Sequence, residues 1–268
     1  MSKLFLSADI EGTCGVAHWD ETDPDKQDYA AFADQMSREV GAACEGLLMG
    51  GADSILVRDA HNTARNIRTS MLPDNDRISI LRGWARDPYA MMSGLDESFT
   101  GVLFTGYHSA AGWDGNPLSH TMNTQNQHIR INGEDCSELM INSMTASMLG
   151  VPVLMVAGDR QLCDWFHTKV PSAVTVPVSC GLGDASMSIM PGEAVRRIRT
   201  GAERAMALSP QDCLFPMPEH FRVEIEYRRH FMARAKSWYP GASQKDATTV
   251  LYESDRWFDV LTFFHFCL

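Results

Sequence analysis

Short apolar runs alternate with longer helical patterns along the first 160 residues, and this alternation restricts the fold more than any other feature. The clearest run is Val151–Ala157, which is rich in β-branched residues and bounded by Gly150 and Gly158; it predicts a buried strand. Five shorter runs predict further strands: Lys3–Ala8, Ser54–Val57, Ile78–Leu81, Val102–Thr105 and Ile129–Ile131. Strands that alternate with helices form βαβ units, so we expect an α/β fold with a mainly parallel sheet covered by helices.

Two long helical patterns lie between these strands. Asp28–Met49 has apolar residues at spacings of three and four and is followed by Gly50 and Gly51, which is typical of an amphipathic helix and its end. Ser137–Leu149 begins at a serine suited to an N-cap and is followed by Gly150.

The pattern changes after about residue 171, where prolines interrupt the chain. A helix is expected at Glu193–Leu208, and strands are expected at Arg222–Tyr227 and Thr248–Leu251. We therefore expect residues 1–214 to form the α/β domain and residues 215–268 to form a smaller α+β portion.

Composition excludes some classes of partner. The chain has 34 acidic and 23 basic residues and a formal charge of −11, which argues against nucleic acid or an anionic membrane and suits cations, metals or amines. No apolar stretch approaches the roughly 20 residues of a membrane span, and the N-terminal apolar run is too short for a signal peptide. Seven scattered cysteines without a CxxC motif predict reduced thiols in a cytoplasmic protein.

Polar side chains follow several of the predicted strands. Ligands in an open α/β sheet bind beyond the carboxyl ends of its strands. The carboxylates and imidazoles that directly follow predicted strands are Asp9, Glu11, Asp59, His61, His108 and Asp159. Residues from separate strands are thus expected to meet at one edge of the sheet.

The residue types alone leave the role of these side chains open. Asp9 and Glu11 share a face on extended backbone, where a divalent cation would relieve their mutual repulsion, but an aspartate before a glycine-containing loop is also common in turns. His61, His108 and the loop residue His120 suit metal binding and equally suit hydrogen-bonded structural roles. Glu138 lies in the first turn of a predicted helix, where the helix dipole alone accounts for a carboxylate.

Other common site motifs are absent from the sequence. No GxGxxG follows a strand and no GxxxxGK[ST] occurs, which argues against classical dinucleotide and P-loop nucleotide sites. The GxSxG nucleophile motif and the HExxH zinc motif are also missing.

Six short motifs occur in one order with consistent spacing. They are ADIEG, RDAHN, TGYHS, LSHTM, SEL and VPVLMVAGD. In this order they resemble the DppA-like D-aminopeptidase family, peptidase family M55, and the similarity covers essentially the whole chain. The resemblance implies two zinc ions per subunit, bound in the expected domain of residues 1–214, which would be the catalytic domain.

The resemblance also implies a role for each site residue. Asp9 matches an aspartate that bridges both metals. Glu11 and His108 match the ligands of one metal, and His61 and Glu138 match the ligands of the other. His120 matches a catalytic histidine. Apart from the resemblance, Asp59 is a candidate for orienting a histidine ligand from outside the metal shell.

The function implied by the resemblance is that of a metallo-aminopeptidase. Two metal ions would activate water for attack on the carbonyl of a short peptide containing D-amino acids, such as a D-Ala dipeptide or amide. Family members of this kind assemble as homodecamers. Two alternatives stay open: a two-metal hydrolase acting on L-peptides or other small amides, and a non-catalytic protein that binds metal or a small ligand.

Overall fold

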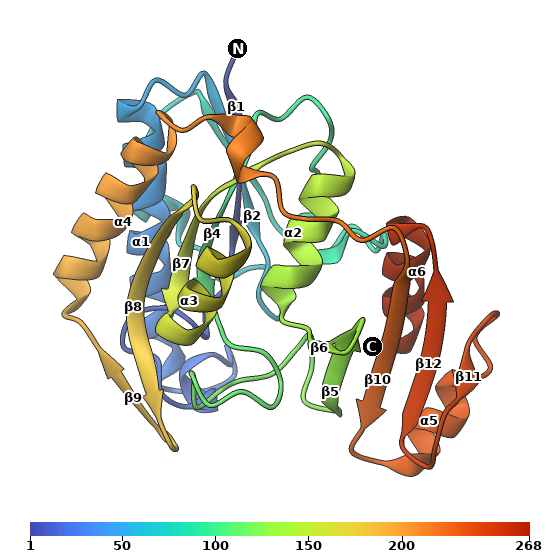
Figure 1. Ribbon diagram of the computed structural model, residues 1–268. Coiled ribbons are helices and arrows are strands. Elements are labelled where there is room, and N and C mark those ends of the chain that lie inside the picture. Colours follow the sequence, from blue (N-terminus) through green and yellow to red (C-terminus); the bar gives the residue numbers. More distant parts are fainter.

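The computed structural model describes all 268 residues and contains two sheets (Figure 1). The larger sheet has seven strands in the order β3-β2-β1-β4-β7-β8-β9. Their bounds are β1 (Lys3–Ala8), β2 (Ser54–Asp59), β3 (Ile78–Leu81), β4 (Gly101–Tyr107), β7 (Val153–Asp159), β8 (Val174–Leu182) and β9 (Ala185–Ser188). Neighbouring strands pair in parallel except β8 and β9, which are antiparallel. The predicted α/β fold with a mainly parallel sheet is confirmed.

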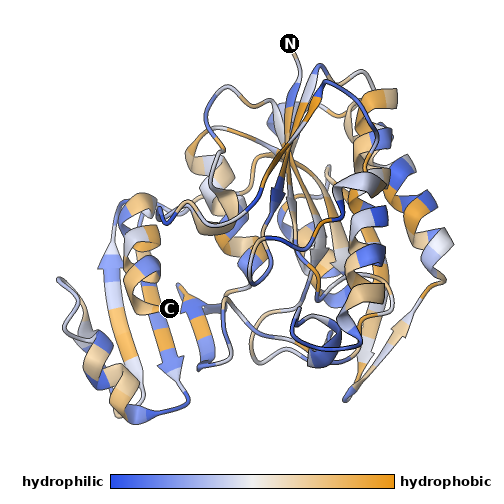
Figure 2. Ribbon diagram, turned by 180° about the vertical axis from the view of Figure 1, so that it is seen from behind, coloured by the Kyte–Doolittle hydropathy of each residue, from blue (hydrophilic) through white to orange (hydrophobic).

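Four helices pack around this sheet: α1 (Tyr29–Met49), α2 (Glu138–Met148), α3 (Arg160–Lys169) and α4 (Pro191–Ala205). α1 and α4 pack against each other on one face, and α3 contacts β7 and β8 from the other (Figure 1). Hydrophobic residues are concentrated in the strands, whereas α4 carries both kinds of residue (Figure 2). The connections contain the short 3-10 helices η1 (Trp19–Glu21), η2 (Thr69–Met71), η3 (Ala90–Met92) and η4 (Pro210–Cys213).

The smaller sheet is antiparallel and has five strands in the order β11-β12-β10-β5-β6. Its elements are β5 (Asn126–Ile131), β6 (Glu134–Asp135), β10 (Phe221–Tyr227), β11 (Ser243–Gln244) and β12 (Thr249–Ser254), with the helices α5 (His230–Lys236) and α6 (Trp257–Cys267). α6 packs on β10 and β12 and also reaches α2. Residues 126–135 therefore join the C-terminal part of the chain in space, and the division at residue 215 stays a prediction.

Most predicted elements are present with shifted ends, and several others were not predicted. The helix expected at Ser137–Leu149 spans Glu138–Met148 with Ser137 as its N-cap, and the run Ile129–Ile131 is part of β5. The helices α3, α5 and α6 and the strands β8 and β9 were not predicted. All seven cysteines are unpaired. None of the helices combines the length and apolar character that crossing a bilayer requires.

The strand order reverses between β1 and β4. From β1 the chain continues to β2 and β3 on one side, whereas β4, β7 and β8 follow on the other. The backbones beyond this point are unusually close: the Gly12 amide donates to the Gly106 carbonyl at 2.8 Å. A Cβ at Gly12 would lie 1.8 Å from the Tyr107 carbonyl oxygen, and one at Gly106 would lie 2.0 Å from the Asp9 carbonyl oxygen. Glycine at these two positions allows the loop after β1 to touch the end of β4, where a ligand site is expected.

Candidate metal site

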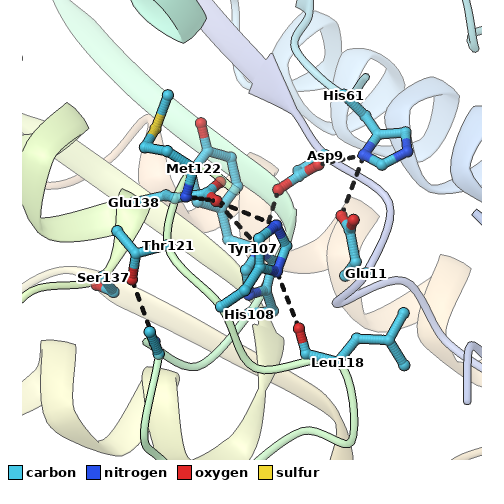
Figure 3. A network of polar contacts seen from close by, with 12 residues as sticks. Asp9, Glu11, His61, Tyr107, His108, Leu118, Thr121, Met122, Ser137 and Glu138 are labelled. Atoms are coloured by element: carbon cyan, nitrogen blue, oxygen red, sulfur yellow. Dashed lines mark hydrogen bonds and ion pairs between the residues drawn. The ribbon is translucent and has the colours of Figure 1, made fainter. Parts of the chain in front are cut away.

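Side chains from three strand ends converge where the strand order reverses. Asp9 and Glu11 follow β1, His61 follows β2, and His108 follows β4. Because β1 pairs with both β2 and β4, the carboxyl ends of all three strands lie at the same edge. All four side chains are buried, with residue exposures between 1% and 9%. The convergence predicted from the sequence is therefore present (Figure 3).

Glu138 reaches the same point from the N-terminus of α2. The Ser137 hydroxyl accepts a hydrogen bond from the Met140 amide at 3.1 Å and caps the helix. Glu138 Oε1 accepts a hydrogen bond from the Met122 amide at 2.6 Å and lies 3.6 Å from His108 Nε2. The helix start thus directs a carboxylate toward the strand ends (Figure 3).

Asp9 lies between the two histidines. Its Oδ1 is 3.2 Å from His61 Nδ1, and its Oδ2 is 3.5 Å from His108 Nε2. Glu11 Oε2 is 3.2 Å from the same His61 nitrogen. Each carboxylate oxygen of Asp9 therefore faces a different histidine, and each histidine has a second carboxylate beside it, Glu11 or Glu138.

This grouping differs from the ligand pairing implied by the resemblance, which stays a prediction. Glu11 was expected with His108 and Glu138 with His61, but the structure places Glu11 beside His61 and Glu138 beside His108. The reason is the position of the elements. β2 lies on one side of β1, whereas β4 and α2, which contact each other, lie on the other.

The residues suit metal binding in two ways: they supply the atom types that bind metals, and some of their buried atoms have no hydrogen-bond partner. Two sets of ligand atoms lie within 4.8 Å of one another, Asp9–Glu11–His61 and His108–His120–Glu138. The buried atoms Glu11 Oε2 and His108 Nε2 have no hydrogen-bond partner. Carboxylate oxygen and imidazole nitrogen are ligands that zinc accepts. Cations within the two sets would satisfy these two atoms.

Backbone carbonyl groups orient each histidine ring. The Thr22 carbonyl is 2.8 Å from His61 Nε2, and the carbonyls of Ser109 and Leu118 are 3.0 Å from His108 Nδ1 and 2.9 Å from His120 Nδ1. A ring nitrogen that donates to a carbonyl leaves the other nitrogen as an acceptor, as a metal ligand must be. The nitrogen left free in each case is the one that faces the carboxylates. No sequence signal identified these three carbonyl partners.

Asp59 and Asp159 do not touch the histidine rings. Asp59 accepts hydrogen bonds from the backbone amides of Asn66 and Ile67 at 2.5 and 2.8 Å and from the Asn66 side chain. Asn66 Nδ2 donates to the His61 carbonyl at 2.6 Å, so Asp59 orders the His61 loop rather than the ring that it was expected to orient. Asp159 accepts from the Ser109 amide and hydroxyl and from the Leu162 amide that begins α3.

The buried charges shift one another's pKa values. Burial lowers the pKa of His61, but the neighbouring Glu11 and Asp9 outweigh it, so the pKa of His61 lies well above its usual value. Burial and the partners Glu138 and Asp9 act in the same way on the pKa of His108. Burial raises the pKa of Asp9, yet His108 and His61 lower it below its ordinary value overall. The carboxylates thus favour positive charge at both histidines, as they would favour a metal cation.

His120 stands at the edge of this cluster. Its ring stacks on His108 with centroids 4.4 Å apart and planes at 7°, and Trp19 packs edge-on against it at 5.1 Å. His120 Nε2 lies 3.5 Å from Glu138 Oε1. The His120 side chain is 12% exposed, against 0% for His108, so it borders the open space in front of the cluster.

That open space is a cavity of about 530 Å³ lined by 16 residues. They include the cluster residues Asp9, Glu11, His61, His120 and Glu138, together with Asp20 and Asp23 from the loop after β1. No lysine or arginine lines it. The cavity is therefore strongly acidic and suited to a cationic group.

Comparison with known proteins assigns the chain to a family. The model of the peptidase family M55, D-aminopeptidase, matches residues 2–266. A D-aminopeptidase of Bacillus subtilis (strain 168) is 30% identical over 252 residues, which make up 93% of this chain and 90% of that protein. The solved structure of the Zn-dependent D-aminopeptidase DppA from Bacillus subtilis, a self-compartmentalizing protease, superposes with a TM-score of 0.89 at 26% identity, over 99% of this chain and 96% of that one. The chain therefore belongs to the D-aminopeptidases of peptidase family M55.

Proposed function

We propose that this chain is a zinc-dependent aminopeptidase that hydrolyses short peptides containing D-amino acids, with two zinc ions at the site between β1 and β4. The observation that supports this most is the position of Asp9, whose two oxygens face separate histidine–carboxylate pairs. A shared carboxylate between two sets of ligands suits two cations held close together. The zinc-dependent D-aminopeptidase of the same fold supports the metal and the substrate class.

The distances between the side chains support two ligand sets. Asp9, Glu11 and His61 would hold one ion, and Asp9, His108 and Glu138 would hold the other. When bound, such a pair polarises a carbonyl group and lowers the pKa of a water molecule. The Thr22 and Ser109 carbonyls keep the His61 and His108 rings in the orientation that ligation needs.

His120 is the histidine left to act on the substrate. It borders the cavity, and the Leu118 carbonyl at its Nδ1 leaves Nε2 directed toward Glu138 and the cluster. From there it can stabilise negative charge on the substrate oxygen or give a proton to the leaving amine. Asp20 and Asp23 add negative charge that attracts the free amino group of the substrate.

We also propose that the chain forms a homo-oligomer, a decamer by its family resemblance. Exposed large apolar residues support subunit contacts at two places: Leu182, Met187 and Met190 lie on or just after the β8–β9 hairpin, and Phe231, Trp238 and Phe266 lie in the C-terminal part. A cytoplasmic location stays a prediction.

The oligomer can be tested by light scattering on the purified protein. We expect a mass near ten times the 29.8 kDa of one chain. A monomeric mass at micromolar concentration would contradict assembly of any kind, and a smaller closed oligomer would contradict only the decamer.

Hydrolysis of matched D and L dipeptides tests the function. Zinc-loaded protein should cleave D-Ala-D-Ala and not L-Ala-L-Ala, because the family acts on D-amino acids. A chelator should abolish cleavage and added zinc should restore it, measured as alanine released. Equal cleavage of the L dipeptide would replace the D-aminopeptidase assignment with a general two-metal amide hydrolase.

Metal content tests the ligand sets. His61→Ala and His108→Ala should each lower the zinc content from about two ions per chain to about one, because each removes a ligand from one set only. Asp9→Asn should lower it further, since Asp9 faces both sets. The control is His167→Ala, an exposed histidine on α3. Two ions retained by the His61 and His108 variants, by elemental analysis after dialysis, would refute the assignment.

His120→Ala should separate catalysis from metal binding. We expect kcat to fall by about 10²–10⁴-fold with the zinc content unchanged, because proton transfer or charge stabilisation acts in the transition state. A raised KM with unchanged kcat would instead show that His120 only positions the substrate. Loss of zinc would place it among the ligands.

A further inference from the structure

A second cavity, of about 280 Å³, adjoins the cavity of the metal cluster. Trp84, Met122 and Asn123 line both, so the two spaces meet at these side chains. The remaining wall comes from the loop before η3, from α2 and from α6, and eight of its 14 lining residues are hydrophobic. Ile141 of α2 and Leu261 of α6 are among them.

Trp84 is held firmly at the boundary between the cavities. The guanidinium of the fully buried Arg58 lies 4.7 Å from the centre of its ring, a cation–π contact. Its Nε1 donates a 2.7 Å hydrogen bond to the carbonyl of Asn62, the residue after His61. Trp84 is therefore linked to the loop that carries His61.

Met122, which also lines both cavities, is hydrogen-bonded to the metal cluster. Its amide donates to Glu138 Oε1 at 2.6 Å, and its backbone has φ +65° (Figure 3). Six non-glycine residues have positive φ, and four of them line one or both cavities: Asn62, Arg86, Ala90 and Met122. Strained backbone of this kind is retained where the surrounding structure holds a binding or catalytic site in shape.

The two cavities differ in charge: Arg86 lies beside Asp87 in the second cavity, whereas the charged side chains of the metal cavity are all acidic apart from its histidines. Arg86 is the one lysine or arginine among all the residues that line them, and it makes no hydrogen bond or ion pair within the chain. Asp87 beside it already accepts bonds from the Tyr89 amide and the Ser93 hydroxyl. Asp20 and Asp23 line only the metal cavity.

This arrangement sets the direction of a bound dipeptide. An aminopeptidase substrate carries its ammonium group on the residue whose carbonyl is attacked, and the acidic metal cavity attracts that group. The residue beyond the scissile bond must then extend away from it, and a dipeptide ends there in a carboxylate. The cavity that contains Arg86 and an apolar wall matches that residue.

We infer that the second cavity binds the residue on the carboxyl side of the scissile bond, that it takes an apolar side chain, and that Arg86 binds the terminal carboxylate of a dipeptide. The inference rests on the proposed aminopeptidase function. It makes dipeptides with an apolar second residue better substrates than amides that lack this residue.

The cavity assignment can be tested by comparing kcat/KM for two pairs of substrates on zinc-loaded protein. The first ratio compares D-Ala-D-Leu with D-alaninamide, which has nothing to place in the cavity. Ile141→Phe should lower this ratio at least about tenfold because the larger phenylalanine ring fills the cavity, and the volume-conserving Ile141→Leu should lower it far less.

The second ratio compares D-Ala-D-Leu with its C-terminal amide. Arg86→Gln should lower this ratio about tenfold, mainly through KM, because the charge-assisted contact is lost.

Arg82→Gln is the matched control for Arg86. Arg82 is exposed near the start of the same loop and lines neither cavity, so both ratios should stay as in the wild-type protein. The inference is overturned if Ile141→Phe and Arg86→Gln change all substrates in the same proportion, or if wild-type protein prefers D-alaninamide to D-Ala-D-Leu.

Binding of a reaction product, D-leucine, tests the assignment of the second cavity without measuring catalysis. Calorimetry should detect D-leucine binding to zinc-loaded wild-type protein, weaker binding to Arg86→Gln and none to Ile141→Phe. If no peptide is hydrolysed but D-leucine binds in this pattern, the proposed function fails and the cavity assignment stands. If peptides are hydrolysed but D-leucine does not bind the wild-type protein, the cavity assignment fails and the function stands.

Discussion

The site depends on the Asp9 carboxylate being held between two histidines from neighbouring strands. Asp9 follows β1, which pairs with β2 on one side and β4 on the other, so His61 and His108 approach it from opposite directions. The loop after β1 touches the end of β4 at this point. Gly12 and Gly106 allow it, because a Cβ at either would lie 2.0 Å or less from a carbonyl oxygen of the other segment. Strand order and two glycines thus determine the spacing of the ligand groups.

The electrostatics of the cluster follow from that spacing. Asp9, Glu11 and Glu138 are each at most 4% exposed, and three buried carboxylates so close together repel one another unless positive charge lies between them. Buried polar atoms without partners, such as Glu11 Oε2 and His108 Nε2, cost about 1–3 kcal/mol each. Cations between the carboxylates and histidines remove both costs, so metal binding would relieve the repulsion and satisfy the unpaired atoms.

The sequence predicts the members of the site better than their grouping. Asp9, His61 and His108 could be found because residues after parallel strands meet at one edge. Their grouping depends on which strands are neighbours, so the pairs implied by the resemblance, Glu11 with His108 and Glu138 with His61, stay a prediction beside the distances that the structure shows. α6 was missed because its apolar residues are so many that they hide the helical spacing of its polar ones, Asp259, Thr262 and His265. β8 was missed because Pro177 interrupts its apolar run. The carbonyls that orient the histidines depend on loop conformation, which no residue pattern encodes.

The smaller sheet also contributes to the site. β5 and β6 lead directly into α2, whose first residue is Glu138, so the position of this carboxylate depends on a hairpin paired with β10. The far wall of the second cavity comes from α6, and Trp257 Nε1 of α6 donates to Thr145 Oγ1 of α2 at 3.1 Å. The C-terminal part therefore fixes one end of the metal cluster and one wall of the adjoining cavity. A change in the packing of α6 against α2 would alter both, which couples substrate fit to the metal ligands through a single helix.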